Sequence, residues 1–247
     1  MSPSPRGGCV CAASLYTRLP NFYSKLPPRR GGTGSIPAVT MGVVTSKGAV
    51  NKAQPRVLLL GLDGAGKSSM LYRLKLGEEV TTSPTIGFNV ESVMQSGRSP
   101  GLSMWDVGGQ DLLRNMWSHY YPGTDGLLFV VDSADVERIP FAKEALVVAL
   151  SDSNLDGAPL VVMANKQDLP GALGADEVGE ALGLAASCKG RDWVVKECSV
   201  PTGHGLRDGV QALAAFIKKR FKAQHLQKQQ KQKQQSPGRN EKSVDGV

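Results

Sequence analysis

The chain of 247 residues has few cysteines and no long apolar run. No stretch reaches the roughly 18 consecutive apolar residues of a membrane-spanning helix, so we expect no such span. Its four cysteines, Cys9, Cys11, Cys188 and Cys198, form no CxxC pair and have no zinc-site spacing. A disulfide framework or a metal cluster is therefore not expected, and a reducing compartment fits this pattern best.

Acidic residues are missing from the first 40 residues. The net charge of +7 is therefore spread unevenly over the chain, and three segments differ in charge. Residues 1–40 hold five basic residues, and residues 218–247 hold nine basic and two acidic ones. Residues 41–217 keep 15 basic and 20 acidic residues, a mildly acidic body. This division argues against a broad nucleic-acid surface on the body, and we expect no nucleic-acid partner.

Both ends of the chain have the composition of unfolded segments. Residues 1–40 are rich in Pro, Gly and Ser, which predicts a disordered basic extension. The same residues contain Arg and Ser but no acid, as mitochondrial transit peptides do, and this alternative stays open. Residues 223–247 are rich in Gln and Lys, and we expect a disordered basic tail.

Between these ends, short apolar runs alternate with helical patterns. Residues 126–132 hold no polar side chain before Asp132, as expected for a strand buried on both faces. Such strands separated by helices predict an α/β domain with a mostly parallel sheet and helices on both faces. We expect strands at residues 56–60, 88–94, 102–106, 126–132, 160–164 and 193–200, and helices at 67–76, 135–150 and 206–221.

The first motif is GLDGAGKS at residues 61–68, which matches G-x-x-x-x-G-K-[ST] between a predicted strand and a predicted helix. Its glycines allow backbone N–H groups to surround a phosphate, and the helix N-terminus adds partial positive charge. Lys67 is expected to reach the β- and γ-phosphates, and Ser68 to bind Mg²⁺. An ordinary Gly-rich turn is the alternative. The predicted phosphate-binding residues here are Gly61, Asp63, Gly64, Ala65, Gly66, Lys67, Ser68 and Ser69.

The second motif is NKQD at residues 165–168, where a predicted strand ends. Ligands bind at the carboxyl ends of strands in this architecture. A carboxylate at Asp168 can accept from both N1–H and the 2-amino group of guanine, whereas adenine offers no such pair of donors. We therefore expect selection of GTP over ATP.

Two further motifs hold residue types that bind a γ-phosphate and its Mg²⁺. In WDVGGQ at residues 105–110, Asp106 is placed to hold the Mg²⁺ shell, and the Gly109 N–H to reach the γ-phosphate. Gln110 is placed to orient the attacking water. In PTIGFN at residues 84–89, Thr85 is the candidate that closes on Mg²⁺ through its hydroxyl.

Together GLDGAGKSS, PTIGFNVE, WDVGGQD and NKQDLPGAL resemble the ADP-ribosylation factor and ADP-ribosylation factor-like small GTPases, over about residues 42–220. The nearer resemblance is to the branch that includes ADP-ribosylation factor-like proteins 11 and 14. It implies a P-loop NTPase fold with a six-stranded, mostly parallel sheet, one antiparallel edge strand and helices on both faces. By this resemblance the domain spans residues 55–222, after an N-terminal segment at 41–54.

The resemblance also implies roles for further residues. Asn165 would tie the loops together, Lys166 would stack its stem over the guanine, and Ser199 and Val200 would contact the base. An aromatic cluster of Phe88, Trp105 and Tyr120 would face effectors, with simple core packing as the alternative. The implied partners are an exchange factor, a GTPase-activating protein and effectors, for a chain that acts as a monomer.

The sequence departs from the family pattern in three places. Val200 stands where an Ala is usual and precedes Pro201. The bulk of Val200 and the proline after it predict a weaker affinity for the nucleotide. The link at residues 95–101 is about two residues longer than usual, in a hairpin that slides between the GDP and GTP states in this family. Residues 1–40 have no counterpart.

Residues 41–46, MGVVTS, fit the N-myristoylation pattern at Gly42, provided that translation starts at Met41. One myristoyl chain holds a membrane only marginally, and the basic tail would supply a second signal. We therefore expect a cytoplasmic protein that binds membranes peripherally, with mitochondrial import as the alternative if residues 1–40 act as a transit peptide.

The leading functional hypothesis is a regulatory GTPase that uses GTP, GDP and Mg²⁺, hydrolyses GTP slowly alone, and acts in vesicle trafficking or signalling. The first alternative is a nucleotide-stabilised scaffold with little or no hydrolysis. A P-loop kinase that uses ATP is the second, and NKQD argues against it.

Overall fold

The computed structural model describes residues 54–78, 80–93 and 101–235. The expected extension at 1–40, the lipidation site Gly42 and most of the lengthened link at 95–101 lie outside these residues.

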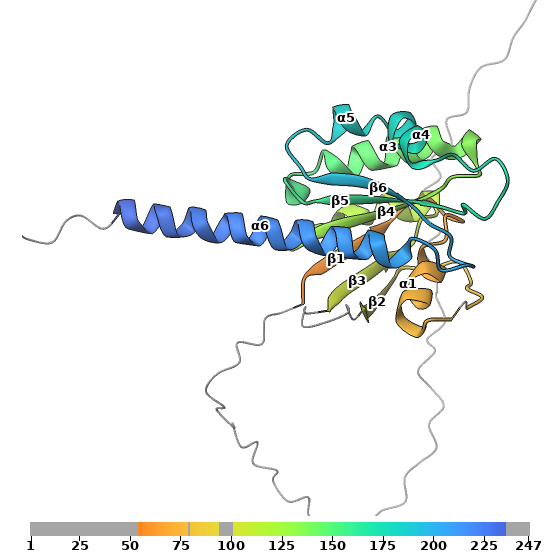
Figure 1. The fold of residues 1–247 in the computed structure, drawn as a ribbon, viewed down its shortest axis with the longest axis horizontal. Helices are drawn as coiled ribbons and strands as arrows, with labels where there is room; N and C mark the ends of the chain where they lie inside the picture. Colours follow the sequence, from red (N-terminus) through yellow and green to blue (C-terminus); the bar gives the residue numbers. More distant parts are fainter. Residues whose placement is uncertain (1–53, 79, 94–100, 236–247) are drawn as a thin grey trace, which may run out of the picture. The chain divides into compact units, whose positions relative to one another are not determined.

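A single six-stranded sheet with the order β2-β3-β1-β4-β5-β6 forms the centre of the described domain (Figure 1). Only β2 runs antiparallel, pairing with β3 from Phe88↔Val107 to Val93↔Leu102. All other neighbours are parallel, which confirms the predicted fold class. The strands are β1 (Arg56–Leu60), β2 (Phe88–Val93), β3 (Leu102–Val107), β4 (Gly126–Asp132), β5 (Leu160–Asn165) and β6 (Trp193–Glu197).

Two apolar cores lie on the two faces of this sheet because strand side chains alternate. Along β1, Leu58 and Leu60 join one core, while Val57 and Leu59 join the other. Almost every residue of β4 and β5 is buried, because helices cover both faces of these central strands.

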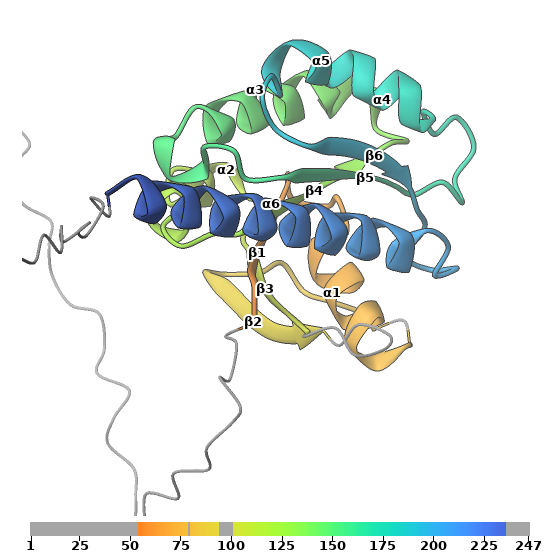
Figure 2. The ribbon, with the colours of Figure 1, turned by 60° about the vertical axis from the view of Figure 1, so that its left-hand side comes forward.

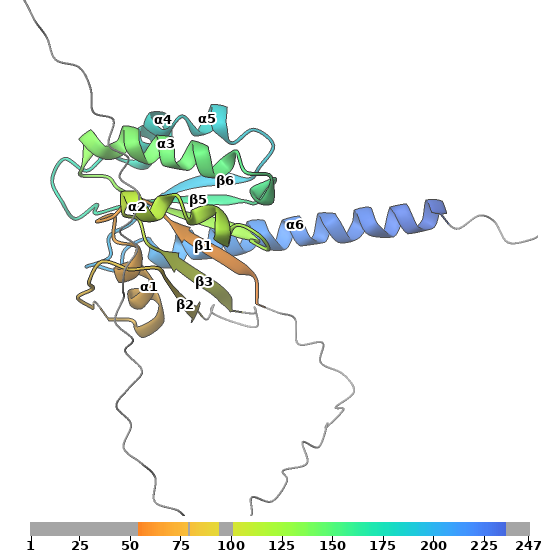
Figure 3. The ribbon, with the colours of Figure 1, turned by 180° about the vertical axis from the view of Figure 1, so that it is seen from behind.

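The helices divide between these faces (Figure 2). The first face is covered by α1 (Lys67–Leu76) and α6 (Leu206–Gln235), whose buried side chains share one core. The second face carries α3 (Ile139–Leu150), α4 (Ala175–Leu182) and α5 (Leu184–Ser187). Figure 3 shows the short helix α2 (Asp111–Arg114), which follows β3 and lies near the carboxyl end of β1. Short 3₁₀ turns follow at η1 (Trp117–Tyr120), η2 (Val136–Arg138) and η3 (Ser153–Leu155).

Two predicted boundaries were wrong. The helix expected at 135–150 starts as the 3₁₀ turn η2, and the α-helix begins only at Ile139. Pro140 explains this, because proline lacks an N–H and fits only the first turn of an α-helix. The strand expected at 193–200 ends at Glu197, and the three residues after it belong to a loop at the candidate site.

The prediction of disorder was also wrong for residues 223–235, because α6 continues to Gln235 and extends beyond the sheet (Figure 1). The exposed extension packs against no core, yet Gln, Lys, Ala and Leu all favour helix, and no Gly or Pro interrupts it. Low complexity in composition does not prevent a helix here.

Among the described residues, none of the helices combines the length and apolar character that crossing a bilayer requires.

Candidate functional site

The loop between β1 and α1 is held in a tight curve that only glycine permits at two positions. Gly61 has φ 142°, and a Cβ there would lie 2.2 Å from the Val130 carbonyl oxygen. Gly66 has φ 95°, and a Cβ there would lie 2.5 Å from Nδ2 of Asn165. Both the backbone angle and the close approach exclude a side chain. The glycines of the first motif thus shape a loop that opens onto the start of α1.

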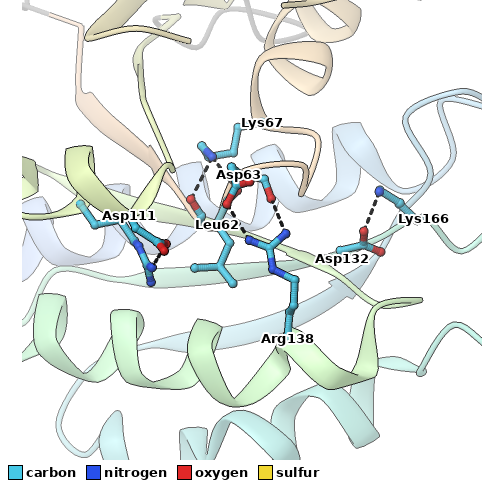
Figure 4. A network of polar contacts seen from close by, with 9 residues as sticks. Leu62, Asp63, Lys67, Asp111, Asp132, Arg138 and Lys166 are labelled. Atoms are coloured by element: carbon cyan, nitrogen blue, oxygen red, sulfur yellow. Dashed lines mark hydrogen bonds and ion pairs between the residues drawn. The ribbon is translucent and has the colours of Figure 1, made fainter. Parts of the chain in front are cut away.

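Lys67, the first residue of α1, turns its side chain back over this loop (Figure 4). Its Nζ donates to the carbonyl oxygens of Gly61 at 2.9 Å and Leu62 at 2.8 Å. The residue is only 6% exposed, and burial lowers the pKa of Lys67 to about 8, against the opposing attraction of Asp106 and Asp63. A phosphate beside this ammonium would favour its charged form.

Three oxygen-bearing side chains from separate segments meet next to Lys67. Ser68 Oγ donates to Asp106 Oδ2 at 2.5 Å and lies 2.6 Å from Thr85 Oγ1. Thr85 Oγ1 donates to the same carboxylate oxygen at 3.4 Å. Asp106 is fully buried, and its Oδ1 has no hydrogen-bond partner among the described residues. Burial raises the pKa of Asp106 above its usual value, while the hydrogen bond from Ser68 opposes the rise.

This set of oxygens fits Mg²⁺. Mg²⁺ prefers oxygen ligands and is usually held by one or two side chains together with substrate phosphates. A buried carboxylate with one unpartnered oxygen beside two hydroxyls has this character. No cluster of three or more His, Cys, Asp or Glu side chains occurs within the described ranges, so a metal cage made of protein side chains alone is absent there.

A cavity of about 420 Å³ opens in front of these groups. It has room for a chain of phosphates, and its lining comes from the first, third and fourth motifs and from residues that directly follow or precede them. The lining residues are Asp63, Gly64, Gly66, Lys67, Ser68, Ser69, Thr82, Ser83, Pro84, Thr85, Gly109 and Gln110. A hydrogen-bonding contact of 2.9 Å between the hydroxyls of Ser69 and Thr82 joins two of its walls.

Gly109 and Gln110 also line this cavity. The Asp63 N–H donates to the Gly109 carbonyl oxygen at 3.2 Å, and a Cβ on Gly109 would lie 2.4 Å from both Gly61 O and Lys67 Nζ. Only glycine allows this approach to the phosphate loop. Gln110 is exposed and precedes α2, so its side chain is accessible from the cavity.

The second motif lies where β5 ends. Asn165 is 1% exposed, and its Nδ2 donates to the Ala65 carbonyl oxygen at 2.8 Å while its Oδ1 accepts from the Val200 N–H at 3.2 Å. This confirms that Asn165 joins the phosphate loop to the loop after β6. Lys166 has φ 71° and forms an ion pair of 2.5 Å with Asp132. Asp168 is exposed in the following turn.

The loop after β6 holds the remaining two predicted base contacts. Ser199 is buried, and its hydroxyl accepts from the Thr202 N–H at 3.3 Å. Val200 is also buried, and its N–H already donates to Asn165. Recognition of a guanine oxygen by this N–H would require sharing it, and this role stays a prediction.

The three predicted aromatic residues do meet in one cluster. Phe88 stacks on Trp105 with ring centroids 5.4 Å apart and lies 5.3 Å from the ring of Tyr120. Arg56 packs its guanidinium 3.8 Å from the Trp105 ring centroid. Phe88 is 50% exposed, whereas Trp105 and Tyr120 are partly buried and pack against the core. The cluster therefore joins the core to the surface, and its contact with effectors stays a prediction.

Sequence reasoning missed two residues that follow or end β4. Arg138 in η2 donates to Asp63 of the phosphate loop, and Asp132 pairs with Lys166 (Figure 4). The available signal was their place after a buried strand, because the carboxyl ends of parallel strands meet at one edge of the sheet.

The sequence and the fold both match known proteins. The sequence pattern of the Arf, or ADP-ribosylation factor, family matches residues 41–217. The fold is similar to that of the Arl6 (BBS3) small GTPase from Trypanosoma brucei, solved with the bound nucleotide analogue GppNp. The two are 28% identical with a TM-score of 0.62, over 67% of this chain and 98% of that one.

Proposed function

The chain belongs to the ADP-ribosylation factor family of small GTPases, a family of GTP-binding switches. From that premise we propose that it hydrolyses GTP slowly and couples the bound nucleotide to effector binding at a membrane. The observation that carries the proposal is the meeting of Ser68, Thr85 and Asp106, because it joins three separate segments at one point beside Lys67. A nucleotide bound there can control the loop around Thr85.

Ser68, Thr85 and Asp106 are the residues that would hold Mg²⁺. When bound, Mg²⁺ would neutralise charge on the β- and γ-phosphate oxygens. Thr85 belongs to a segment without helix or strand, residues 80–87, which is held by hydroxyl contacts with α1 and Asp106 and by the hydrogen bond from the Gly108 N–H to the Gly87 carbonyl oxygen. The loop therefore depends on the groups gathered at this point, which is the property a switch needs.

Asp168 and Lys166 support selection of guanine. The Asp168 carboxylate is free to accept from a base, while Asn165 fixes the loop that carries it relative to the phosphate loop. An acceptor facing adenine would lose the pair of donors that guanine offers, which favours GTP.

Gln110 and Lys67 support hydrolysis. Gln110 opens onto the cavity that Lys67 also lines, so it can orient a water molecule toward the γ-phosphate while Lys67 stabilises its negative charge. Arg138 is occupied by Asp63 and does not serve as an arginine finger. We therefore expect slow turnover, which a GTPase-activating protein supplying an arginine would accelerate by about 10³–10⁵-fold. Release of GDP would need an exchange factor.

The cluster of exposed Phe88 and partly buried Trp105 and Tyr120 is the proposed effector surface. Phe88 begins β2, directly after the loop of Thr85, and Trp105 precedes Asp106. A change at the nucleotide site would reach these rings through a short stretch of backbone, because Phe88 is three residues after Thr85 and Trp105 is next to Asp106. Stacked aromatic groups are typical anchors of protein interfaces.

Membrane attachment rests on two weaker features. Gly42, which lies outside the described residues, would carry the myristoyl group if translation starts at Met41. The exposed end of α6 carries Lys222, Lys228 and Lys231, and the helix has no acidic residue after Asp208. This positive charge favours binding to an anionic membrane surface. The placement in the branch of ADP-ribosylation factor-like proteins 11 and 14, and action in vesicle trafficking or signalling, remain proposals.

A single-turnover assay tests the proposal. The purified chain is loaded with GTP labelled on the γ-phosphate, and phosphate release is followed for the wild type and for Gln110→Leu. We expect slow release that Gln110→Leu abolishes while GTP stays bound. Equal release by both proteins would reject the role of Gln110. GTP that stays bound and intact in the wild type, with or without a GTPase-activating protein, would support the scaffold alternative instead.

A further inference from the structure

Arg138 reaches from η2 to the phosphate loop and contacts one residue twice. Its Nη1 donates to the Asp63 carbonyl oxygen at 3.1 Å, and its Nη2 donates to Asp63 Oδ1 at 2.5 Å (Figure 4). Both side chains are half-exposed, so the ion pair between Nη2 and Oδ1 alone contributes little to stability. The contact from Nη1, however, is to the backbone of the loop itself.

Asp63 is thereby held from two sides. The Asp63 carbonyl and carboxylate oxygens accept from Arg138, and the Asp63 N–H donates to the Gly109 carbonyl oxygen at 3.2 Å. The residue stands at the turn of the loop, next to Gly64, which has φ 74°. A loop fixed in this way has less conformational entropy to lose when it surrounds a phosphate, and preorganisation of this kind strengthens binding.

The charge of Arg138 is balanced within the loop. Its positive charge lies close enough to Lys67 to lower the pKa of that ammonium, whereas the negative charge of Asp63 raises it. Because the two contacts to Asp63 occupy the guanidinium, Arg138 acts on the nucleotide through the loop and not by contact with the reacting phosphate.

We propose that Arg138 is a positioning residue that clamps the phosphate loop through Asp63 and so slows nucleotide release. The inference rests on the proposed function, since it requires a nucleotide in the phosphate loop. It adds to the predicted site a residue 75 positions away from Asp63 in the chain.

The test measures dissociation of a fluorescent GDP, mant-GDP, from the full chain after a chase with excess unlabelled GDP. Loss of one hydrogen bond and a half-exposed ion pair corresponds to a factor of about 5–30, so Arg138→Gln should release mant-GDP about 5–30 times faster than the wild type. Arg220→Gln is the matched control. Arg220 also donates to two backbone carbonyls, those of Asp125 and Asp156, away from the phosphate loop. Its release rate should equal that of the wild type.

A double-variant cycle separates clamping from general loosening. Asp63→Ala removes the carboxylate and leaves the carbonyl contact, so it should release faster than the wild type but slower than Arg138→Gln. The double variant should release no faster than Arg138→Gln alone, because the lost contacts are the same. Arg138→Lys, which keeps the charge and one donor, should restore part of the retention.

The outcomes distinguish the inference from the proposed function. If the wild type does not retain mant-GDP, the proposed function fails and the clamp has no ligand. If the wild type retains it and Arg138→Gln releases it at the rate of Arg220→Gln, the clamp is refuted alone. Multiplicative effects in the double variant would show that Arg138 does not act through Asp63. A fall in the hydrolysis rate of prebound GTP, without faster release, would place Arg138 in the chemistry and overturn the positioning role.

Discussion

Replacing Asn165 with alanine should destabilise the domain more than any substitution of an exposed polar residue. The buried amide donates to Ala65 O at 2.8 Å and accepts from the Val200 N–H at 3.2 Å. Asn165→Ala leaves that carbonyl and that N–H buried without a partner, and each such group costs about 1–3 kcal/mol. Two such groups would cost about 2–6 kcal/mol, and we expect a loss of unfolding free energy near the middle of this range, about 3–4 kcal/mol.

Urea unfolding followed by tryptophan fluorescence, at a fixed concentration of GDP, measures this loss. At a slope of about 2 kcal/mol per molar urea, the midpoint should fall by about 1.5–2 M. Asn154→Ala is the control, because Asn154 is exposed and bonds only to Asp152 in the same turn, and its effect should stay within about 0.5 kcal/mol. Equal midpoints for the two variants would refute the idea that Asn165 joins the two loops.

Three further predictions follow from the geometry. Gly109→Ala should weaken GTP binding at least tenfold in an equilibrium titration, because the new Cβ would collide with Gly61 O and Lys67 Nζ. The control Gly179→Ala in α4 should bind GTP with the affinity of the wild type. Equal affinities of the two variants would contradict the close approach at Gly109. Because burial lowers the pKa of Lys67 to about 8, GDP binding at pH 9 should take up a proton as phosphate restores the ammonium. Calorimetry in buffers of different ionisation enthalpy measures this uptake, which Lys67→Arg should abolish; a binding enthalpy independent of the buffer would count against it. Gln227→Pro should reduce helical circular dichroism without changing GTP affinity, and an unchanged spectrum would contradict the long α6.

The parts of this molecule that the sequence predicts well are those set by local chemistry. The apolar residues of β4 and β5 could only be buried strands, and the glycines at 61 and 66 could only serve a tight loop. Lys67 follows the predicted strand at 56–60 and Asp106 ends the one at 102–106, and the structure has both at the carboxyl ends of the parallel strands β1 and β3.

The parts that the sequence did not predict depend on tertiary placement or on weak local preferences. Arg138 contacts Asp63 because β4 and β1 are neighbours in the sheet. The position of Arg138 after a buried strand indicates the edge of the sheet at which it lies, but it does not identify Asp63 as its partner. The helix at 223–235 was missed because a repetitive composition suggested disorder, although its residues favour helix. The delayed start of α3 follows from Pro140, a local signal that was present and not used.

The choice between nucleotides tests the central claim most directly. Equilibrium competition of GTP and ATP against mant-GDP, for the wild type and Asp168→Asn, measures the base preference of the site. The account predicts that GTP competes at least 100-fold better than ATP with the wild type and that Asp168→Asn loses most of this preference, because the carboxylate accepts both guanine donors. Equal competition by the two nucleotides with the wild type would contradict it.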